Sequence, residues 1–225
     1  VAAMQRQLLD LPHLNHYRAD NARLAPPAAG VSRVVLMGAS LPDTWGRIPG
    51  STFFPGEPCI NRGISGQTTA QMVLRFRQDV IDLDPAVVVI LAGTNDIAGN
   101  TGLATLPMIE DNFRSMTELA QASHIRVILA SVLPTTDYPW QPGLQPATKI
   151  RALNAWLRTY AASRGATYLD YYDALATPQG GMRAHLSSDG VHPTPAGYAI
   201  MAPLAQQAIE RALAQEQERG RARTG

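Results

Sequence analysis

The sequence predicts a three-layer α/β/α sandwich built on a mainly parallel sheet of five strands. Five predicted strands follow one another along the chain, and the continuous apolar runs within 34–37, 85–96 and 125–134 are typical of parallel strands covered on both faces. Segments with apolar residues at helical spacing alternate with these runs, which favours helices on both faces of the sheet. The chain has 225 residues, of which 45% are hydrophobic, enough for the core of one α/β domain.

The whole chain, residues 1–225, is therefore expected to form one domain with an appendage at each end. Residues 1–29 are a lead-in whose apolar residues, from Leu8 to Tyr17, predict a partly helical segment packed on the core. The two prolines of APPAAG should end any helix there. At the other end, residues 218–225 form a basic tail that we expect to fray in solvent.

The first two strands are predicted on either side of a Pro/Gly-rich loop. Residues 34–37, VVLM, form a short continuous apolar run. Residues 59–61 are a plausible second strand after the loop RIPGSTFFPGEP. An apolar pattern with helical spacing follows, and Thr68 or Thr69 would cap that helix.

The second half of the chain continues the alternation. The remaining elements are expected as a strand within 85–96, a helix over 106–123, a strand within 125–134, a helix over 149–165, a short strand at 166–170 and a last helix over 193–213. Pro195 lies near the start of the last helix, where a missing N–H is tolerated.

Composition argues against several classes of function. The 19 basic and 18 acidic side chains leave a formal net charge of +1, so no strong field favours nucleic acid, anionic lipid or a polyanionic substrate. A small or neutral molecule is the expected partner. The sequence lacks the motifs of zinc proteases, P-loops and dinucleotide-binding folds, and it lacks paired cysteines. We therefore expect no metal and no cofactor.

The sequence leaves the location of the protein open. Residues 86–92 form the longest strongly apolar run, far short of the roughly 20 residues of a spanning helix, so we expect a soluble chain without a membrane span. Cys59 is the single cysteine, so no intrachain disulfide indicates a compartment. The chain opens with Val1, and a removed leader would make a secreted or periplasmic location the expectation. The oligomeric state stays open as well.

Four polar clusters lie where a ligand is expected. In open α/β sheets, ligands bind at the carboxyl ends of the strands. Residues 38–40, 61–66 and 93–96 each follow a predicted strand, and a fourth cluster, DGVHP at 189–193, lies just before the last helix. The sheet topology should bring these clusters together.

Within the last cluster, Asp189 and His192 are close enough in sequence to point into one cleft. The carboxylate would accept a hydrogen bond from one imidazole nitrogen and leave the other free to act as a base. Taken alone, the pair is explained equally well by Asp189 capping the last helix and His192 lying at the surface. Asp170, at another strand end, is the rival for the acid, with less suitable spacing.

Ser40, in the stretch MGASLP, needs such a base, because a free hydroxyl is a weak nucleophile at neutral pH. Alone, a serine after a strand is more often a turn residue or a helix cap. An acyl-transfer site also needs donors for an oxyanion, which the Gly66 backbone and the Asn95 side chain can supply. The conjunction of nucleophile, donors and an Asp/His pair favours one acyl-transfer site. The G-x-S-x-G elbow of α/β-hydrolases is absent, because Pro42 stands at its last position.

These residues resemble the SGNH hydrolases, also called GDSL-type esterases and lipases, over about residues 34–202. Four blocks stand in the order of that family: MGASL, NRGISGQTT, LAGTND and SSDGVHP. The resemblance implies a role for the polar residues of each block: Ser40 as nucleophile and first oxyanion N–H donor, Gly66 as second N–H donor, Asn95 as side-chain donor, and Asp189 and His192 as the rest of a Ser-His-Asp triad. It also implies a flavodoxin-like fold, no metal, and ester hydrolysis or, in some members, acyl transfer.

The residues of two blocks narrow the class of substrate that we expect. GISGQTT and AGTND are similar to the lysophospholipase-like and carbohydrate acetylesterase-like branches, which favour short acyl groups. We therefore expect a serine esterase for small esters with short acyl chains, acetyl above all, and an acetylated carbohydrate is a candidate substrate. The alternatives are an acyltransferase acting on a sugar or alcohol, and a non-catalytic binding protein on the same scaffold.

One position departs from the family pattern and motivates the binding-protein alternative. The first block usually reads Gly-Asp-Ser, and Ala39 replaces the acid that in the family supports the loop of the nucleophile. Asp43 is a nearby carboxylate that can partly substitute, unless it is a solvated loop residue. Five aromatic side chains in loops are expected either to rim the site or to pack in the core: Trp45, Phe53, Phe54, Tyr138 and Trp140.

Overall fold

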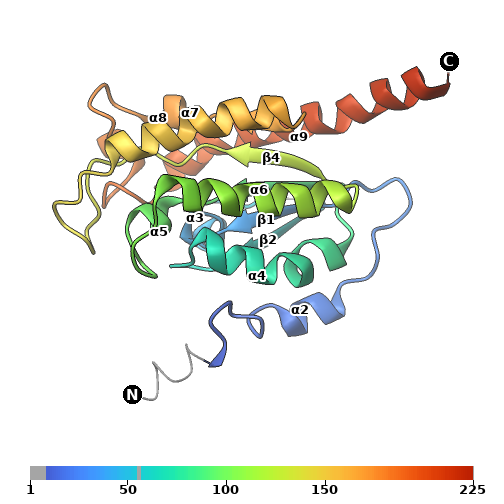
Figure 1. Cartoon of the computed structure of the whole chain (residues 1–225), viewed down its shortest axis with the longest axis horizontal. Helices are drawn as coiled ribbons and strands as arrows, with labels where there is room; N and C mark the ends of the chain where they lie inside the picture. The colour runs from blue at the N-terminus through green and yellow to red at the C-terminus, as the bar shows by residue number, and fades with distance from the viewer. Residues whose placement is uncertain (1–8, 55–56, 225) are drawn as a thin grey trace.

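A computed structural model describes residues 9–54 and 57–224, with side chains up to residue 214. At its centre lies a sheet of five parallel strands in the order β2-β1-β3-β4-β5 (Figure 1). The strands are β1 (Val34–Gly38), β2 (Cys59–Gly63), β3 (Val87–Leu91), β4 (Arg126–Ala130) and β5 (Thr167–Leu169). This order is that of flavodoxin-like sheets. The predicted three-layer fold with a parallel five-stranded sheet is confirmed.

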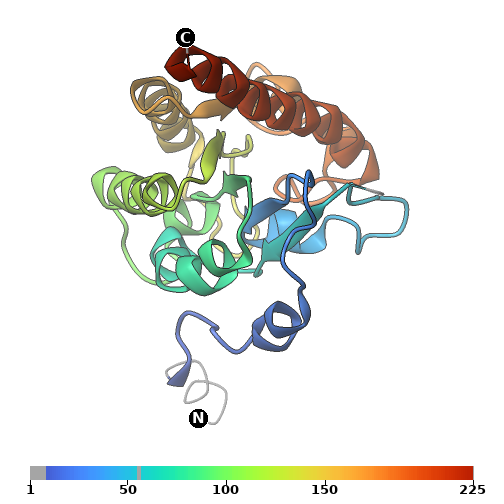
Figure 2. The same cartoon turned by 90° about the vertical axis from the view of Figure 1, so that its right-hand side faces the viewer.

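Helices cover both faces of the sheet (Figures 1 and 2). The longer helices are α4 (Thr69–Asp79), α6 (Leu106–Ala122), α7 (Ala147–Ser163) and α9 (Pro195–Thr224). The shorter ones are α2 (Arg18–Arg23), α3 (Ser40–Thr44), α5 (Thr94–Ile97), α8 (Tyr172–Leu175) and the 3₁₀ turns η1 (Ile81–Leu83) and η2 (Ala184–Leu186). In the described residues, no helix is both long and apolar enough to cross a membrane.

The two cores follow from the alternation of side chains along each strand. Val35 and Met37 of β1 point to the face covered by α4, α6 and α7, whereas Val34 and Leu36 point to the face covered by α3, α8 and α9. All four of these side chains are buried. Both faces of the strand therefore need apolar residues, which explains the continuous apolar run in the sequence.

The strands next to β1 end level with it. Gly38, the last residue of β1, is paired with Gly63 of β2 and with Leu91 of β3. The segments that leave these three strands therefore start side by side at one edge of the sheet. That edge is where three of the predicted polar clusters lie.

The described part of the lead-in is attached by a buried tyrosine and by several hydrogen bonds. Residues 1–8 lie outside the described part, and the helix α2 begins only after Tyr17, the last residue of the predicted apolar stretch. Tyr17 is buried, but Leu9 and Leu11 are 86% and 43% exposed. The described lead-in lies beside α4 (Figure 1), to which it is joined mainly by hydrogen bonds.

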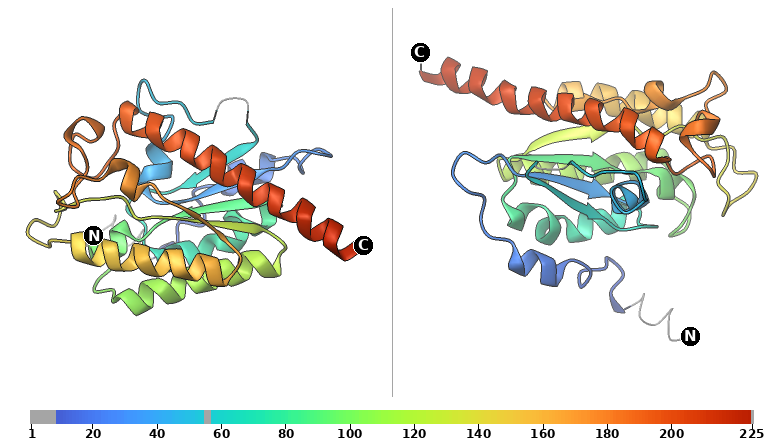
Figure 3. Two further views of the ribbon diagram at one scale, coloured as in Figure 1. Left: turned by 90° about the horizontal axis from the view of Figure 1, so that it is seen from above. Right: turned by 180° about the vertical axis from the view of Figure 1, so that it is seen from behind.

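The last helix is longer than predicted. α9 crosses one face of the sheet and continues to Thr224 (Figure 3). The structure describes no side chain beyond residue 214, so the expected fraying of residues 218–225 stays a prediction. The single-domain organisation stays a prediction as well.

Candidate active site

Ser40 opens a helix directly after a central strand. β1 ends at Gly38, Ala39 is the N-cap, and Ser40 is the first residue of α3. Pro42 lies in the first helical turn, where its missing N–H costs no hydrogen bond. A Cβ atom on Gly38 would lie 2.5 Å from the carbonyl oxygen of Leu91 and 2.6 Å from the Pro42 ring, so this tight turn requires glycine. The turn leaves Ser40 partly exposed at the edge of the sheet.

The structure brings Ser40, His192 and Asp189 together in a hydrogen-bonded chain. His192 Nε2 lies 2.9 Å from Ser40 Oγ, and His192 Nδ1 lies 2.7 Å from Asp189 Oδ2. Because a carboxylate can only accept, Nδ1 carries the proton and Nε2 is left to accept from the Ser40 hydroxyl. His192 and Asp189 therefore have the geometry of a base and its orienting acid.

Asp189 is held in its ionised form by its own loop. Its Oδ1 accepts hydrogen bonds from the backbone N–H groups of Val191, at 2.9 Å, and His192, at 2.8 Å. Partial burial by itself raises the pKa of Asp189, but the hydrogen bonds from the His192 ring and these two N–H groups outweigh it and lower the pKa to about 2. The alternative in which Asp189 merely caps the last helix does not account for the contact with the ring.

The predicted oxyanion donors lie at the neighbouring strand ends. Gly66 is exposed in the turn after β2, with φ of +82°, a conformation that favours glycine. Asn95 is buried at the start of α5, and its Nδ2 donates to the carbonyl oxygen of Gln67 at 2.9 Å. An amide nitrogen carries two hydrogens, and this bond uses one of them. Ser40, Gly66 and Asn95 therefore come from three adjacent segments at one edge of the sheet.

Asp43 is not a solvated loop residue. It is buried in α3, where its Oδ2 accepts from the Ser65 hydroxyl at 2.5 Å and from the Ser65 N–H at 3.2 Å. Its Oδ1 lies 2.7 Å from Nη1 of Arg47. Asp43 thus ties the helix of Ser40 to the residue before Gly66, while the buried Ala39 contributes no polar side chain.

Asp96 has a role that sequence reasoning missed. Its carboxylate accepts from the Thr69 N–H at 3.0 Å and from the Thr69 hydroxyl at 2.5 Å, which anchors the N-terminus of α4. Burial raises the pKa of Asp96, against the opposing effect of the bonds from Thr69. Thr68 is the N-cap of α4, in a capping box with Gln71, as one of the two predicted caps. Asp96 stands in the block LAGTND, but Thr69, which it binds, lies 27 residues away in the sequence, so no local pattern predicts the contact.

The rival acid and the five aromatic candidates differ in whether they contact the candidate site. Asp170, the rival acid, is bonded to Arg158. Trp140 is 40% exposed, and its ring centroid lies 6.2 Å from that of His192. Its Nε1 donates to Asn100 at 3.0 Å. Trp45, Phe54 and Tyr138 are buried, and Phe53 packs on Trp45. Of the five aromatic candidates, Trp140 therefore contacts the site.

Known proteins resemble this chain in sequence and in fold. The model of the GDSL-like Lipase/Acylhydrolase family matches residues 28–200. A GDSL-like lipase from Bacteroides thetaiotaomicron is 44% identical, with a TM-score of 0.85 over 89% of this chain and 98% of that one. A proposed acylhydrolase from Bacteroides fragilis is 43% identical, with a TM-score of 0.87 over 91% and 99% of the two chains.

One curated relative is an enzyme by name. Esterase TesA of Pseudomonas aeruginosa is 29% identical over 135 residues, which span 60% of this chain and 60% of that protein. An acetyl xylan esterase from Geobacillus stearothermophilus shares the fold, with a TM-score of 0.64 at 21% identity over 82% of this chain and 96% of that one.

Proposed function

The chain belongs to the GDSL-like Lipase/Acylhydrolase family, and on that basis we propose that it is a serine esterase that hydrolyses short-chain acyl esters. The observation that carries the proposal is the hydrogen-bonded chain from Ser40 Oγ through His192 to Asp189, with distances of 2.9 and 2.7 Å. Gly66 and Asn95 supply the donors that an oxyanion needs at the neighbouring strand ends. An esterase uses each of these groups, whereas a binding protein would need neither the base nor the acid.

In the proposed reaction, His192 Nε2 takes the proton of Ser40 as Oγ attacks the carbonyl carbon of the ester. The oxyanion is held by the N–H groups of Ser40 and Gly66 and by the Asn95 amide. His192 then gives its proton to the leaving alcohol oxygen, and an acyl group remains on Ser40. A water molecule, deprotonated by His192, attacks this acyl group, and the acid leaves as Ser40 regains its proton. Asp189 stays ionised throughout and stabilises the imidazolium.

Two observations bear on the substrate. Trp140 presents a partly exposed ring beside His192, on which an apolar sugar face or a short acyl group can pack. The shared fold with an acetyl xylan esterase also makes acetylated carbohydrates the first compounds to try. Since Gly66 is exposed and Ser40 partly exposed, water has access to the site, which favours hydrolysis over transfer to an alcohol.

Replacement of the nucleophile tests the proposal. Ser40→Ala should lower kcat for p-nitrophenyl acetate by about 10³- to 10⁶-fold, because the attacking oxygen is lost. Ser188→Ala, an exposed serine beside Asp189, is the matched control and should keep the wild-type rate. A fluorophosphonate should label Ser40 covalently. Near-wild-type turnover by Ser40→Ala would refute the mechanism.

A panel of esters addresses the acyl chain and the acceptor. Rates measured with p-nitrophenyl esters of increasing chain length and with acetylated xylo-oligosaccharides rank the substrates. Product analysis in the presence of a competing alcohol separates hydrolysis from acyl transfer. A protein that binds these compounds but neither turns them over nor accepts the fluorophosphonate would be the binding protein instead.

A further inference from the structure

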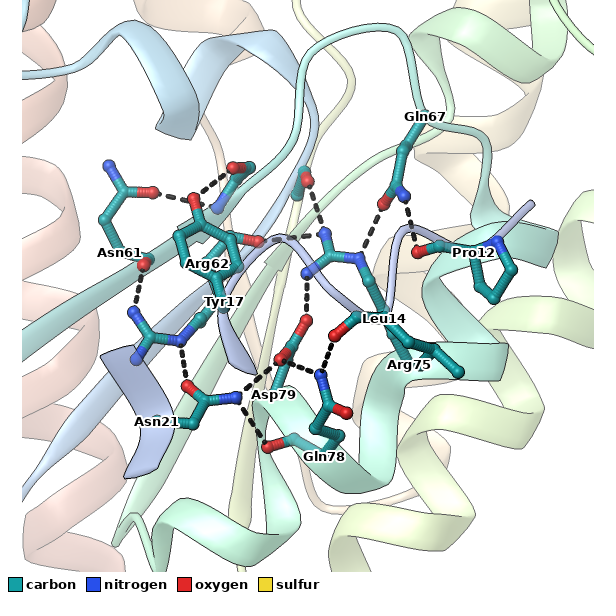
Figure 4. Close-up of polar contacts among 12 residues, drawn as sticks. Pro12, Leu14, Tyr17, Asn21, Asn61, Arg62, Gln67, Arg75, Gln78 and Asp79 are labelled. Carbon is teal, nitrogen blue, oxygen red and sulfur yellow. Dashed lines mark hydrogen bonds and ion pairs between the residues drawn. The ribbon is translucent and has the colours of Figure 1, made fainter. Parts of the chain in front are cut away.

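Arg75 is a fully buried arginine whose guanidinium makes four hydrogen bonds (Figure 4). Its Nε donates to Gln67 Oε1 at 2.6 Å, and its Nη2 donates to the carbonyl oxygens of Gly38, at 3.0 Å, and Arg62, at 2.9 Å. Its Nη1 lies 3.0 Å from Oδ2 of Asp79, which is also fully buried. A planar guanidinium holds such acceptors in a fixed relative geometry.

Two of these acceptors, on Gly38 and Gln67, belong to the segments that carry the proposed oxyanion donors. Gly38 is the last residue of β1, two residues before Ser40. Gln67 follows Gly66, and its carbonyl oxygen accepts the hydrogen bond from Asn95. One buried side chain therefore links the strand end of the nucleophile to the turn of Gly66 and, through that turn, to the amide of Asn95.

The turn of Gly66 is thus held from both flanks. Asp43 of α3 binds Ser65 on one side, and Arg75 of α4 binds the Gln67 side chain on the other. Gly66 itself is exposed and has no side chain. Its position depends on these neighbours and on Asn100, whose Nδ2 donates to the Gly66 carbonyl oxygen at 3.2 Å. Donors stabilise an oxyanion only when they lie within a few tenths of an ångström of the required place.

We infer that Arg75 is a positioning residue for the proposed oxyanion hole, acting through Gly38 and Gln67. The inference rests on the proposed esterase function. This role gives a reason for the burial of a cation behind the proposed active site. If the site were only structural, apolar residues could fill the same space without the cost of removing a charge from water.

The test compares the kcat of the variants per active site. The number of active sites is counted by labelling Ser40 to completion with a fluorophosphonate. Arg75→Lys keeps a positive charge for Asp79 but cannot reach Gly38 and Gln67 together. We expect its kcat for p-nitrophenyl acetate to fall by about 10- to 100-fold, with KM changed by less than about 3-fold. Arg77→Lys, on the exposed side of the same helix, should match the wild type.

A second pair of variants leaves the Arg75–Asp79 pair intact. Gln67→Met and Gln67→Glu both remove the amide nitrogen, but only Gln67→Glu keeps an oxygen acceptor for Nε of Arg75. We expect Gln67→Met to lose kcat by about 10-fold and Gln67→Glu to recover most of it. Wild-type kcat per labelled site in both Arg75→Lys and Gln67→Met, with only the thermal midpoint lowered, would overturn the inference.

A readout independent of turnover separates this inference from the proposed function. The Gly66 amide signal in a nitrogen–proton NMR spectrum should shift or broaden in Gln67→Met and stay near its wild-type position in Gln67→Glu. If the wild type neither hydrolyses esters nor accepts the fluorophosphonate, the proposed function fails, and this signal still decides whether Arg75 positions the turn. An unchanged Gly66 signal in Gln67→Met would overturn the inference.

Discussion

At the scale of single residues, Asp189 holds the ring of His192 in the orientation in which Nε2 faces Ser40. It does so by accepting from Nδ1 at 2.7 Å, which selects the tautomer with a free Nε2. Asp189→Asn should therefore lower kcat by about 10³- to 10⁴-fold with little effect on the fold. The matched control is Asp170→Asn, the rival carboxylate bonded to Arg158, which should keep wild-type kcat. The reverse ranking of the two variants would reassign the acid.

The lowered pKa of Asp189 has a defined effect on pH dependence. With a folded-state pKa of about 2, below the unfolded value, its contribution to stability is present above roughly pH 4 and is lost as the pH falls toward 2. Asp189 thus stays ionised over the working range. In kcat/KM measured from pH 8 down to pH 4, we therefore expect no loss that comes from protonation of Asp189, so the limiting slope on the acid side should not exceed one. A slope of two would contradict this.

The residues that could be predicted from the sequence are those with a local signal. Ser40 follows a strand, and Asp189 and His192 lie three positions apart. Asp43, Asp96 and Arg75 could not be assigned, because their partners Ser65, Thr69 and Gly38 are far away in sequence and meet them only in the folded chain.

At the scale of elements, the turn from β1 into α3 depends on close packing at Gly38. Gly38→Ala places a Cβ 2.5 Å from a backbone oxygen of β3, which cannot move without shifting the strand. We expect this variant to lose about 1–3 kcal/mol of unfolding free energy in urea and to lower kcat, because α3 carries Ser40. Gly181→Ala, whose Cβ would be 3.2 Å from a flexible threonine side chain, is the control. Equal midpoints for both variants would argue against this packing.

Elements were predictable where their pattern was long enough. The strands β1, β3 and β4 were recognised as apolar runs, and α6 and α7 lie within two residues of their predicted bounds. The short helices α3, α5 and α8 have four or five residues, too few for a helical period to show in the sequence. The lead-in was predicted only as a partly helical segment over residues 1–29, and α2 lies within it.

At the scale of the whole molecule, the lead-in completes the hydrogen-bond network behind the proposed active site. Three glutamines on or next to α4 donate hydrogen bonds to backbone carbonyl oxygens of the lead-in: Gln67 to Pro12 at 2.9 Å, Gln71 to Leu11 at 2.7 Å and Gln78 to Leu14 at 2.7 Å. Figure 4 shows two of these contacts beside Arg75 and Asp79. The appendage is therefore continuous with the network that holds the turn of Gly66.

Truncation and surface substitution should affect this attachment differently. Removing residues 1–16 deletes the three hydrogen bonds and should lower the thermal midpoint by roughly 5–10 °C, at about 1 kcal/mol for each bond. The pair Leu9→Ser and Leu11→Ser should leave the midpoint unchanged within about 1 °C, because both are surface leucines outside the buried core. A larger loss from the serine pair than from the truncation would show that apolar packing attaches the lead-in.

The overall topology was predictable because it follows from general rules. Alternating strands and helices with right-handed crossovers lead to a parallel sheet with two covered faces, and the family resemblance adds the flavodoxin-like strand order. The path of the lead-in does not follow from such rules. It depends on individual hydrogen bonds to Gln67, Gln71 and Gln78, which no hydrophobic pattern encodes.

The direction of these three hydrogen bonds bears on how the chain can vary in evolution. The lead-in supplies carbonyl groups, which every amino acid carries, whereas the α4 side supplies glutamine amides, which only a few side chains can replace. At positions 11, 12 and 14 these bonds therefore depend on the path of the backbone and not on the side chains, whereas each glutamine amide is itself required. Elsewhere in the lead-in the side chains do matter, because Tyr17 bonds to the carbonyl oxygen of Gly63 and Asn21 to the carboxylate of Asp79.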